Sequence, residues 1–392
     1  MIAPDDCQSY LQEICHRYEQ WWAENALTEA ISARQATFSF EQMVQTEEKT
    51  SEGESKKITL SIFTAIQNYV ESEHILLVGS PGIGKSTALL RCLVQLAERE
   101  REKSEPRLPI LVSMKKYKVS FSNSEDPSGM LTLIRNALLP KIRRKVSVSE
   151  VERLLLDKRL ILLLDGLNEM PADAIRTHLK AFREECQDSQ VPLICTTREL
   201  GGGDLGIKRR LEIKPLRSEE VERFLQDCIP EQKQKVLQLL NHDNRELSRT
   251  PFVLWMLYDL FQKQGTEVET LAEAFRQFFR SFKKYKEDAP VLDERRQEWN
   301  RWLEHLAFTM LNNLDPTDPG LVISKEQAEK SLIENFGDLY GASSRIEELL
   351  KYHLLEPISE KEISFHHQLI QEYYAAECLL TQLPESLKKQ PK

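Results

Sequence analysis

The sequence predicts an α/β fold, in which a five-stranded parallel sheet flanked by helices is followed by an all-α part and a smaller C-terminal part. Three observations predict it. Up to about Pro215, short and nearly all-apolar runs alternate with amphipathic helical stretches, which is typical of a parallel sheet covered on both faces. After Pro215 the strand signal nearly vanishes. Near the C-terminus, two helical stretches precede two short strands and a last helix.

Each strand of the predicted sheet is a short apolar run. The strands are expected at Ile75–Val78, Pro109–Val112, Leu160–Leu164, Leu193–Thr196 and Leu211–Ile213. The helices of this part are expected at Ile58–Val70, Lys85–Glu100, Met130–Leu139, Ser149–Leu156 and Ala172–Cys186. Because the carboxyl ends of parallel strands meet at one edge of a sheet, Gly79, Asp165 and Thr196 should lie close together there.

The remainder of the chain is predicted to be mostly helical. After Pro215, helices are expected at Ser218–Gln226, Pro230–Leu240, Phe252–Gln262, Thr270–Tyr285 and Asp293–Asn313. Helices at Ser324–Phe336 and Ser344–Tyr352, strands at Leu354–Ile358 and Glu362–Phe365, and a helix from about His367 to Leu383 then indicate a winged-helix unit.

The segment before the core is helical from Gln8 to about Ala33, with an apolar face that includes Trp21 and Trp22. We favour packing of this face onto the body of the protein over a partner-binding helix. The polar stretch Thr46–Lys57 is predicted to be a linker. The expected divisions are an N-terminal segment 1–45, a linker 46–57, a core 58–215, a helical domain 216–290, a winged-helix domain 291–383 and a tail 384–392.

Composition excludes several classes of protein. The 392 residues include 53 basic and 62 acidic side chains, and the net charge of −9 argues against a general nucleic-acid or anionic-membrane surface. The 7 cysteines form no CxxC pair, which suits a reducing cytosol. No apolar run approaches the roughly 18 residues of a membrane span, and no signal peptide is evident. A cytoplasmic protein without a membrane segment is therefore expected.

A glycine-rich loop follows the first predicted strand. The pattern Gly79-x4-Gly84-Lys85-Ser86 is that of a phosphate-binding loop, whose backbone N–H groups surround a phosphate at the start of a helix. Lys85 would reach the β- and γ-phosphates, and the Ser86 hydroxyl would ligate Mg²⁺. The predicted nucleotide-binding residues are Gly79, Ser80, Pro81, Gly82, Ile83, Gly84, Lys85, Ser86 and Thr87.

Two later strands end in groups that complement this loop. Asp165 ends the strand Leu160–Leu164, where its carboxylate can hold Mg²⁺. Glu169 lies one loop turn further on and is the candidate general base that polarises the attacking water, with a solvated loop acid as the alternative. Arg198 follows two threonines at the end of another strand, where a guanidinium can sense the γ-phosphate. The predicted catalytic residues are Glu169, Lys85 and Arg198.

In combination, these motifs resemble the NACHT-type NTPases, a branch of the STAND class of P-loop signal-transduction ATPases, and the bacterial members in particular. Three segments resemble family motifs: Asp-Gly-Leu-Asn-Glu at 165–169, Leu-Ser-Arg-Thr-Pro-Phe-Val-Leu-Trp-Met-Leu at 247–257, and the Phe-His-His…Glu-Tyr-Tyr-Ala-Ala run at 365–376. The resemblance covers about residues 58–382.

The resemblance implies further site residues. Pro251 would pack against the adenine, and His367 would contact the β-phosphate of ADP and lock a closed state, with a hydrogen-bonded structural histidine as the alternative. Asn168 replaces the acid usual in the family, which argues against fast hydrolysis but not against binding. The implied function is a slow ATPase switch with Mg²⁺, closed with ADP and open and oligomerisation-competent with ATP, in bacterial defence or stress signalling.

Other functions remain open at this stage. One is an ATPase remodelling enzyme that turns over continuously, another is a winged-helix DNA-binding regulator, and a third is a fragment without function. The acidic last helix, with Glu372 and Glu377, argues against DNA binding. Because no sensor or effector domain is evident, the expected partners are further copies of the chain or a separate sensor or effector chain. Tyr373, Tyr374, Leu379 and Leu380 should form an exposed apolar patch if nothing covers them.

Overall fold

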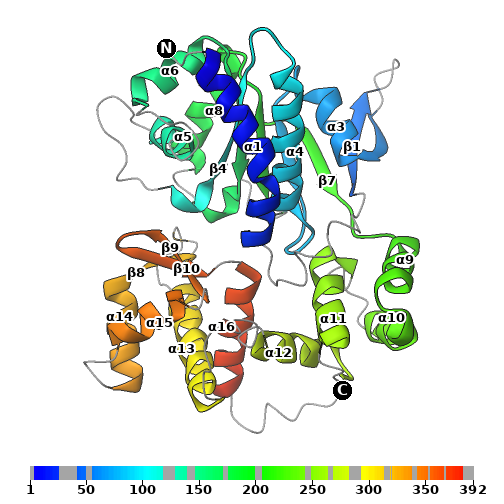
Figure 1. Cartoon of the computed structure of the whole chain (residues 1–392), viewed down its shortest axis with the longest axis vertical. Coiled ribbons are helices and arrows are strands. Elements are labelled where there is room, and N and C mark those ends of the chain that lie inside the picture. The colour runs from blue at the N-terminus through cyan, green and yellow to red at the C-terminus, as the bar shows by residue number, and fades with distance from the viewer. Residues whose placement is uncertain are drawn as a thin grey trace. The chain divides into compact units, whose positions relative to one another are not determined.

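The computed structural model of the protein describes residues 4–25, 42–49, 55–117, 129–138, 146–170, 175–198, 205–242, 249–263, 268–281, 293–312, 318, 320–337, 342–351, 354–365 and 368–382. The chain divides into two compact units, Met1–Leu271 and Ala272–Lys392 (Figure 1). Each unit is described by itself below.

The first unit is organised around a sheet of 7 strands, in the order β2-β1-β7-β3-β6-β5-β4. The five strands expected from the sequence are present and parallel to one another. The bounds are β1 Met43–Lys49, β2 Ser55–Ser61, β3 Ile75–Val78, β4 Leu108–Ser113, β5 Leu160–Asp165, β6 Leu193–Thr197 and β7 Arg209–Ile213.

The expectations of a five-stranded sheet and of a linker at 46–57 are wrong, because β1 and β2 form an antiparallel hairpin that extends the sheet. β1 joins the sheet by antiparallel pairing with β7, with Val44 opposite Ile213. Val44 and Thr46 of β1 are buried, whereas Glu47 is exposed and lies opposite Lys57 in the register. A polar edge hairpin has the composition of a linker, and its pairing cannot be inferred from that composition.

The helices around the sheet follow the expected order. They are α1 Pro4–Asn25, α3 Ile62–Tyr69, α4 Lys85–Arg101, α5 Met130–Leu138, α6 Val148–Leu156 and α8 Lys180–Asp188, with short turns at Met114–Lys116, Leu167–Glu169 and Ile175–Leu179. The helix expected from Ile58 begins at Ile62, because the preceding residues belong to β2. Ser61 caps it by accepting a hydrogen bond from the Thr64 N–H at 3.2 Å.

The N-terminal helix packs on the body of the unit, as expected. α1 lies beside α4, and Tyr10 and Leu11 are fully buried (Figure 1). The Tyr10 hydroxyl donates to the Pro109 carbonyl at 2.8 Å, so it satisfies a backbone acceptor on the edge strand β4. The side chains of Trp21 and Trp22 lie outside the described residues.

The core of the first unit is the parallel part of the sheet. Every residue from Leu160 to Leu164 is fully buried, as expected for a strand covered on both faces. Burial of a leucine side chain contributes about 1.5–3 kcal/mol, so this strand alone is a large part of the stabilisation. Its carboxyl end carries Asp165, which the core holds in place.

A helical part completes the first unit. It consists of α9 Ser218–Cys228, the turn Pro230–Gln232, α10 Lys233–His242 and α11 Pro251–Lys263. Trp255 of α11 packs edge-to-face on Phe224 of α9, with ring centroids 5.0 Å apart. The Leu216 N–H donates to the Arg249 carbonyl at 2.9 Å, which ties the end of the sheet to the start of α11. The all-α character expected after Pro215 is confirmed for this part.

The second unit contains helices and a small antiparallel sheet. The helices are α12 Leu271–Ser281, which spans the division between the units, α13 Asp293–Leu311, α14 Lys325–Phe336, α15 Ala342–Lys351 and α16 Gln368–Gln382. The strands β8 Val322–Ser324, β9 Leu355–Ser359 and β10 Glu362–Phe365 pair in the order β8-β10-β9. Both strands of the expected hairpin are present, β8 is additional, and the assignment as a winged helix stays a prediction.

The last helix only partly fits the expected exposed patch. Tyr374 is buried, and the ring of Tyr373 stacks on Phe279 with centroids 4.5 Å apart. Leu379 and Leu380 are 50% and 44% exposed, as expected. Among the described residues, no helix is long and apolar enough to cross a membrane.

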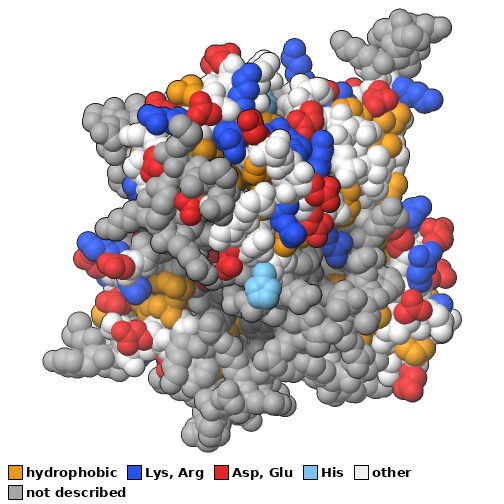
Figure 2. Space-filling view, turned by 45° about the horizontal axis from the view of Figure 1, so that its top comes forward, with side chains coloured by type: hydrophobic (Ala, Val, Ile, Leu, Met, Phe, Trp, Pro, Cys, Tyr) orange, Lys and Arg blue, Asp and Glu red, His pale blue; other side chains and the backbone are white. Residues whose placement is uncertain are grey.

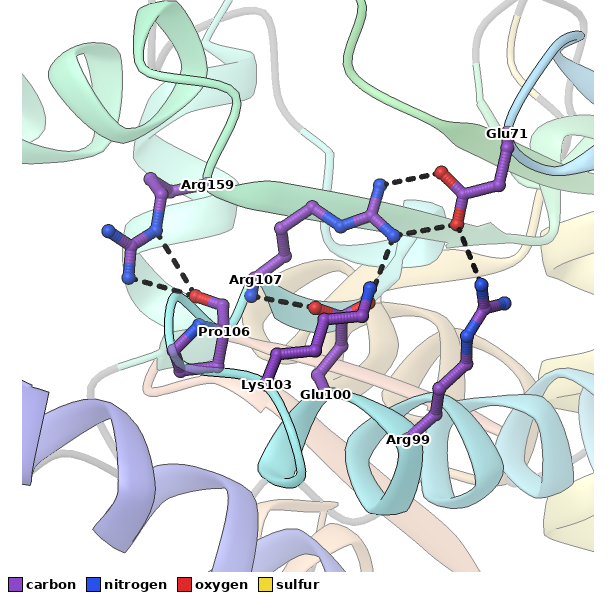
Figure 3. A network of polar contacts seen from close by, with 7 residues as sticks. All are labelled: Glu71, Arg99, Glu100, Lys103, Pro106, Arg107 and Arg159. Carbon is purple, nitrogen blue, oxygen red and sulfur yellow. Dashed lines mark hydrogen bonds and ion pairs between the residues drawn. The ribbon is translucent and has the colours of Figure 1, made fainter.

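An ion-pair network around the buried Glu100 lies at the amino-terminal ends of the strands, opposite the edge that carries Asp165. Glu100, in the last turn of α4, is fully buried and accepts hydrogen bonds from Lys103 Nζ at 2.6 Å and from the Arg107 backbone N–H at 2.9 Å (Figure 3). The Arg107 guanidinium also pairs with Glu71, at 2.7 and 3.0 Å. Burial alone would raise the pKa of Glu100, but these hydrogen bonds outweigh it and lower the pKa.

We predict that Glu100→Gln lowers the free energy of unfolding by about 2 kcal/mol, because Lys103 and Arg107 lose their buried, charged acceptor. Since the folded-state pKa of Glu100 is lowered, the stabilisation is present above the unfolded-state pKa and is lost as the pH falls through the folded-state value. Urea unfolding between pH 7 and pH 3 measures both effects. The matched control is Glu98→Gln, two residues earlier on the exposed side of α4. Equal effects of the two substitutions would contradict the prediction.

Candidate functional site

The glycine-rich loop between β3 and α4 is closely packed against its neighbours. A Cβ at Gly79 would lie 2.9 Å from the Ile83 side chain, and a Cβ at Gly82 would lie 3.1 Å from the Cβ of Phe252. Gly82 also has a positive φ of 72°, which L side chains rarely adopt. The loop therefore needs glycine at these positions for close approach and for backbone angle.

The third glycine of the loop faces Gln42, the residue just before β1. Gly84 has a φ of 98°, and a Cβ there would collide with the side-chain nitrogen of Gln42. Gly84 is also the N-cap of α4, where it supplies no side-chain acceptor to the first-turn N–H groups. Those N–H groups and the positive end of the helix form an anion-binding site. A side chain at position 84 would displace the Gln42 amide that packs against this turn.

The remaining loop residues surround this anion-binding site. Lys85 Nζ donates to the carbonyls of Gly79 at 2.6 Å and Ser80 at 3.0 Å, so its ammonium group lies against the loop. Ser86 is exposed, whereas the Ile83 side chain is buried in the core. Ser80, Pro81 and Thr87 are half-buried. A cation and a hydroxyl thus accompany the backbone donors, as a phosphate and its metal ion require.

Asp165 lies at the same edge of the sheet, held by a threonine of the neighbouring strand. The fully buried Thr196 hydroxyl donates to Asp165 Oδ1 at 2.6 Å and accepts from the Gly166 N–H at 2.8 Å. These bonds fix the orientation of the carboxylate. Together with the Ser86 hydroxyl, the carboxylate forms a set of hard oxygen donors that fits Mg²⁺.

Thr197, the next residue, differs from Thr196 in the bonding of its hydroxyl. Thr197 pairs in register with Val78, and its carbonyl accepts from the Gly79 N–H at 3.4 Å, so it borders the start of the loop. Its side-chain hydroxyl is buried and has no hydrogen-bond partner among the described residues. A buried hydroxyl of this kind at a ligand-binding edge is suited to a bound polar group.

The two remaining candidates for catalysis are brought to this edge as well. Gly166 has a φ of 81°, and a Cβ there would lie 2.7 Å from the carboxyl carbon of Glu169. The Glu169 carboxyl therefore lies against Gly166, immediately after Asp165. The Arg198 N–H donates to Asn168 Oδ1 at 3.3 Å, which joins the end of β6 to this turn. An amide oxygen at position 168 still accepts this bond without carrying a charge.

Of the two site residues that the family resemblance implies, the structure describes Pro251 but not His367. Pro251 begins α11, and the next N–H, that of Phe252, donates to the Gly82 carbonyl at 3.4 Å. Pro251 thus lies beside the loop, and its role toward adenine stays a prediction. His367 lies outside the described residues. Gln42 is not predicted from the sequence, because a lone polar residue before a polar stretch carries no signal of its contact with the loop.

Comparison with known proteins identifies the family that this part of the chain resembles. Residues 73–232 match the NACHT domain family, which confirms over these residues the resemblance seen in the sequence. No curated protein matches the chain.

Several solved structures are similar to the chain. A Walker-type ATPase of Pyrococcus abyssi is 14% identical, with a TM-score of 0.37 over 79% of this chain and 93% of that one. The Aeropyrum pernix ORC1 protein, solved with DNA, is 18% identical, with a TM-score of 0.36 over 82% and 94%. A STAND protein with a tetratricopeptide-repeat sensor from Pyrococcus horikoshii is 13% identical, with a TM-score of 0.36 over 85% of this chain and 46% of that one. These likenesses are too distant to carry a functional argument.

We predict different consequences for the two adjacent threonines. Thr196→Val should lower the free energy of unfolding by about 1–3 kcal/mol, because it leaves the Gly166 N–H and the Asp165 carboxylate without their shared partner. Thr197→Val should be neutral or slightly stabilising, because no described residue bonds to its hydroxyl. Urea unfolding of the ligand-free protein measures the difference. A larger loss for Thr197→Val than for Thr196→Val would contradict this account.

Proposed function

We propose that this NACHT-type P-loop ATPase is a nucleotide-dependent molecular switch, which binds ATP or ADP with Mg²⁺ and hydrolyses ATP slowly. The observation that carries the proposal is the loop of residues 79–86, whose glycines are each packed against a neighbour while its N–H groups remain at the start of α4. The carboxylates of Asp165 and Glu169 lie at the same sheet edge, where a metal-bound triphosphate requires them.

Each group has a role in this proposal. The loop N–H groups and Lys85 bind the β- and γ-phosphates, and Ser86 and Asp165 would hold Mg²⁺, which neutralises phosphate charge when it is bound. Glu169 accepts the proton of the attacking water. Arg198 senses the γ-phosphate from the end of β6.

Slow hydrolysis is supported by the environment of Asn168. Its amide oxygen accepts from the Arg198 N–H, so the turn keeps its shape with one carboxylate fewer than the family usually has. A site that binds nucleotide tightly and hydrolyses ATP slowly suits a switch, because a bound ligand shifts a conformational equilibrium by its differential affinity for the two states.

The finer points of the proposal come from the family resemblance. They are an ADP-bound closed state secured by His367, an ATP-bound open state that self-associates or engages a separate sensor or effector chain, and a role in bacterial defence or stress signalling. Glu372 and Glu377 make α16 acidic, which argues against DNA binding through this helix. Figure 2 shows basic and acidic side chains interspersed on the visible face.

We predict that the wild-type protein retains nucleotide through purification and that added ADP raises its melting temperature. Ligand at about 100 times its Kd stabilises a protein by about 2.7 kcal/mol. Lys85→Ala should abolish this shift, whereas Lys180→Ala, an exposed lysine on α8, should not. Nucleotide-free wild-type protein that is indifferent to ADP would refute the proposed function.

We predict that Glu169→Gln slows single-turnover ATP hydrolysis by about 100-fold or more, because the base that accepts the proton is lost. The affinity for ADP should stay within about threefold, since the phosphate contacts come from other residues. Glu152→Gln, an exposed acid on α6, is the matched control. Wild-type turnover much faster than about one per second would instead favour a continuously active remodelling enzyme.

A further inference from the structure

We propose that Gln42 is a positioning residue of the phosphate-binding loop, which acts by holding the Ile83 carbonyl and thereby orienting the Gly84 N–H. The inference rests on the proposed nucleotide binding. Gln42 belongs to no motif, and it lies just before β1, forty-one residues away from Ile83 in the chain.

The contact itself is specific. The Gln42 side chain is 8% exposed, and its Nε2 donates to the carbonyl oxygen of Ile83. A carbonyl oxygen can only accept, so the amide must present its nitrogen rather than its oxygen to the loop. The amide lies in the space beside Gly84 that a Cβ would occupy.

The geometry of the peptide bond transmits this contact. The Ile83 carbonyl and the Gly84 N–H belong to one planar trans peptide, in which the two groups point in opposite directions. When Gln42 holds the carbonyl, the Gly84 N–H is turned away from Gln42. That N–H is one of the backbone donors that a loop of this sequence directs at a phosphate. Gln42 therefore sets the orientation of a phosphate-binding donor without touching the nucleotide.

The backbone of Gln42 is held firmly enough to serve this purpose. Its carbonyl accepts from the Ile62 N–H at 2.9 Å, and the next carbonyl, that of Met43, accepts from the Lys214 N–H at 2.9 Å. The segment is thus bonded both to the start of α3 and to the end of β7. In this proposal, the β1–β2 hairpin has the role of positioning Gln42 against the loop.

The test compares Gln42→Met, which keeps the length of the side chain but has no donor, with Gln42→Glu, which faces the carbonyl with an acceptor. Gln45→Met, three residues later on β1, is the matched control and should bind like the wild type. Calorimetric titration measures the affinity for ADP, and competition measures the affinity for inorganic pyrophosphate. Thermal unfolding without ligand reports stability separately.

We expect Gln42→Met to weaken ADP and pyrophosphate by the same factor of about ten, the effect of one lost buried hydrogen bond, and Gln42→Glu to weaken them further. The ligand-free melting temperature of Gln42→Met should lie somewhat below that of Gln45→Met, because the buried Ile83 carbonyl loses its donor, but the variant should stay fully folded at the temperature of the titration.

Unchanged affinities in Gln42→Met would overturn this inference and leave the proposed function intact. So would weaker ADP binding with unchanged pyrophosphate binding, which would place Gln42 at the base or ribose. A fall in ligand-free stability that accounts for the whole loss would assign it a structural role only. Wild-type protein that binds neither ligand would overturn the proposed function and this inference with it.

Discussion

The phosphate-binding loop depends on close contacts that only glycine permits. Gly79 is packed against Ile83, Gly82 against Phe252 of α11, and Gly84 against Gln42. At Gly79 and Gly84 the approach is closer than real Cβ atoms tolerate, and at Gly82 the positive φ adds to a tight contact. The loop is thus shaped by its own sequence together with two elements that are distant in the chain, namely the helical part and the amino-terminal hairpin.

The sheet edge that carries Asp165 is arranged on the same principle, because each side chain that would face a ligand there is held by a neighbouring residue. Thr196 orients Asp165, and the space at Gly166 receives the Glu169 carboxyl. The Arg198 N–H donates to Asn168, so the neutral residue at position 168 keeps the end of β6 joined to the turn Leu167–Glu169. Preorganisation of this kind favours tight binding, and the missing carboxylate at position 168 is compatible with slow chemistry.

The structural roles of polar residues are the least evident in the sequence. Glu100 belongs to a charged run that resembles a solvated helix end, yet it is fully buried among Lys103 and Arg107. The β1–β2 segment has the composition of a linker and forms two strands of the sheet. The partners of Glu100 lie three and seven residues later in the chain, and composition does not show that they enclose it. The hairpin instead depends on a distant partner, since the Arg209 guanidinium donates to the Glu47 carbonyl at 2.7 Å.

Local patterns alone determined the five parallel strands, the flanking helices and the positions of Lys85, Asp165 and Glu169, because apolar periodicity and glycine spacing act over a few residues. Tertiary structure decided the rest. It added the hairpin to the sheet, buried Tyr374 against its neighbours, and brought Gln42 and Phe252 to the loop. These features arise from pairing between distant segments, and a pairing leaves no mark in the sequence of either segment taken by itself.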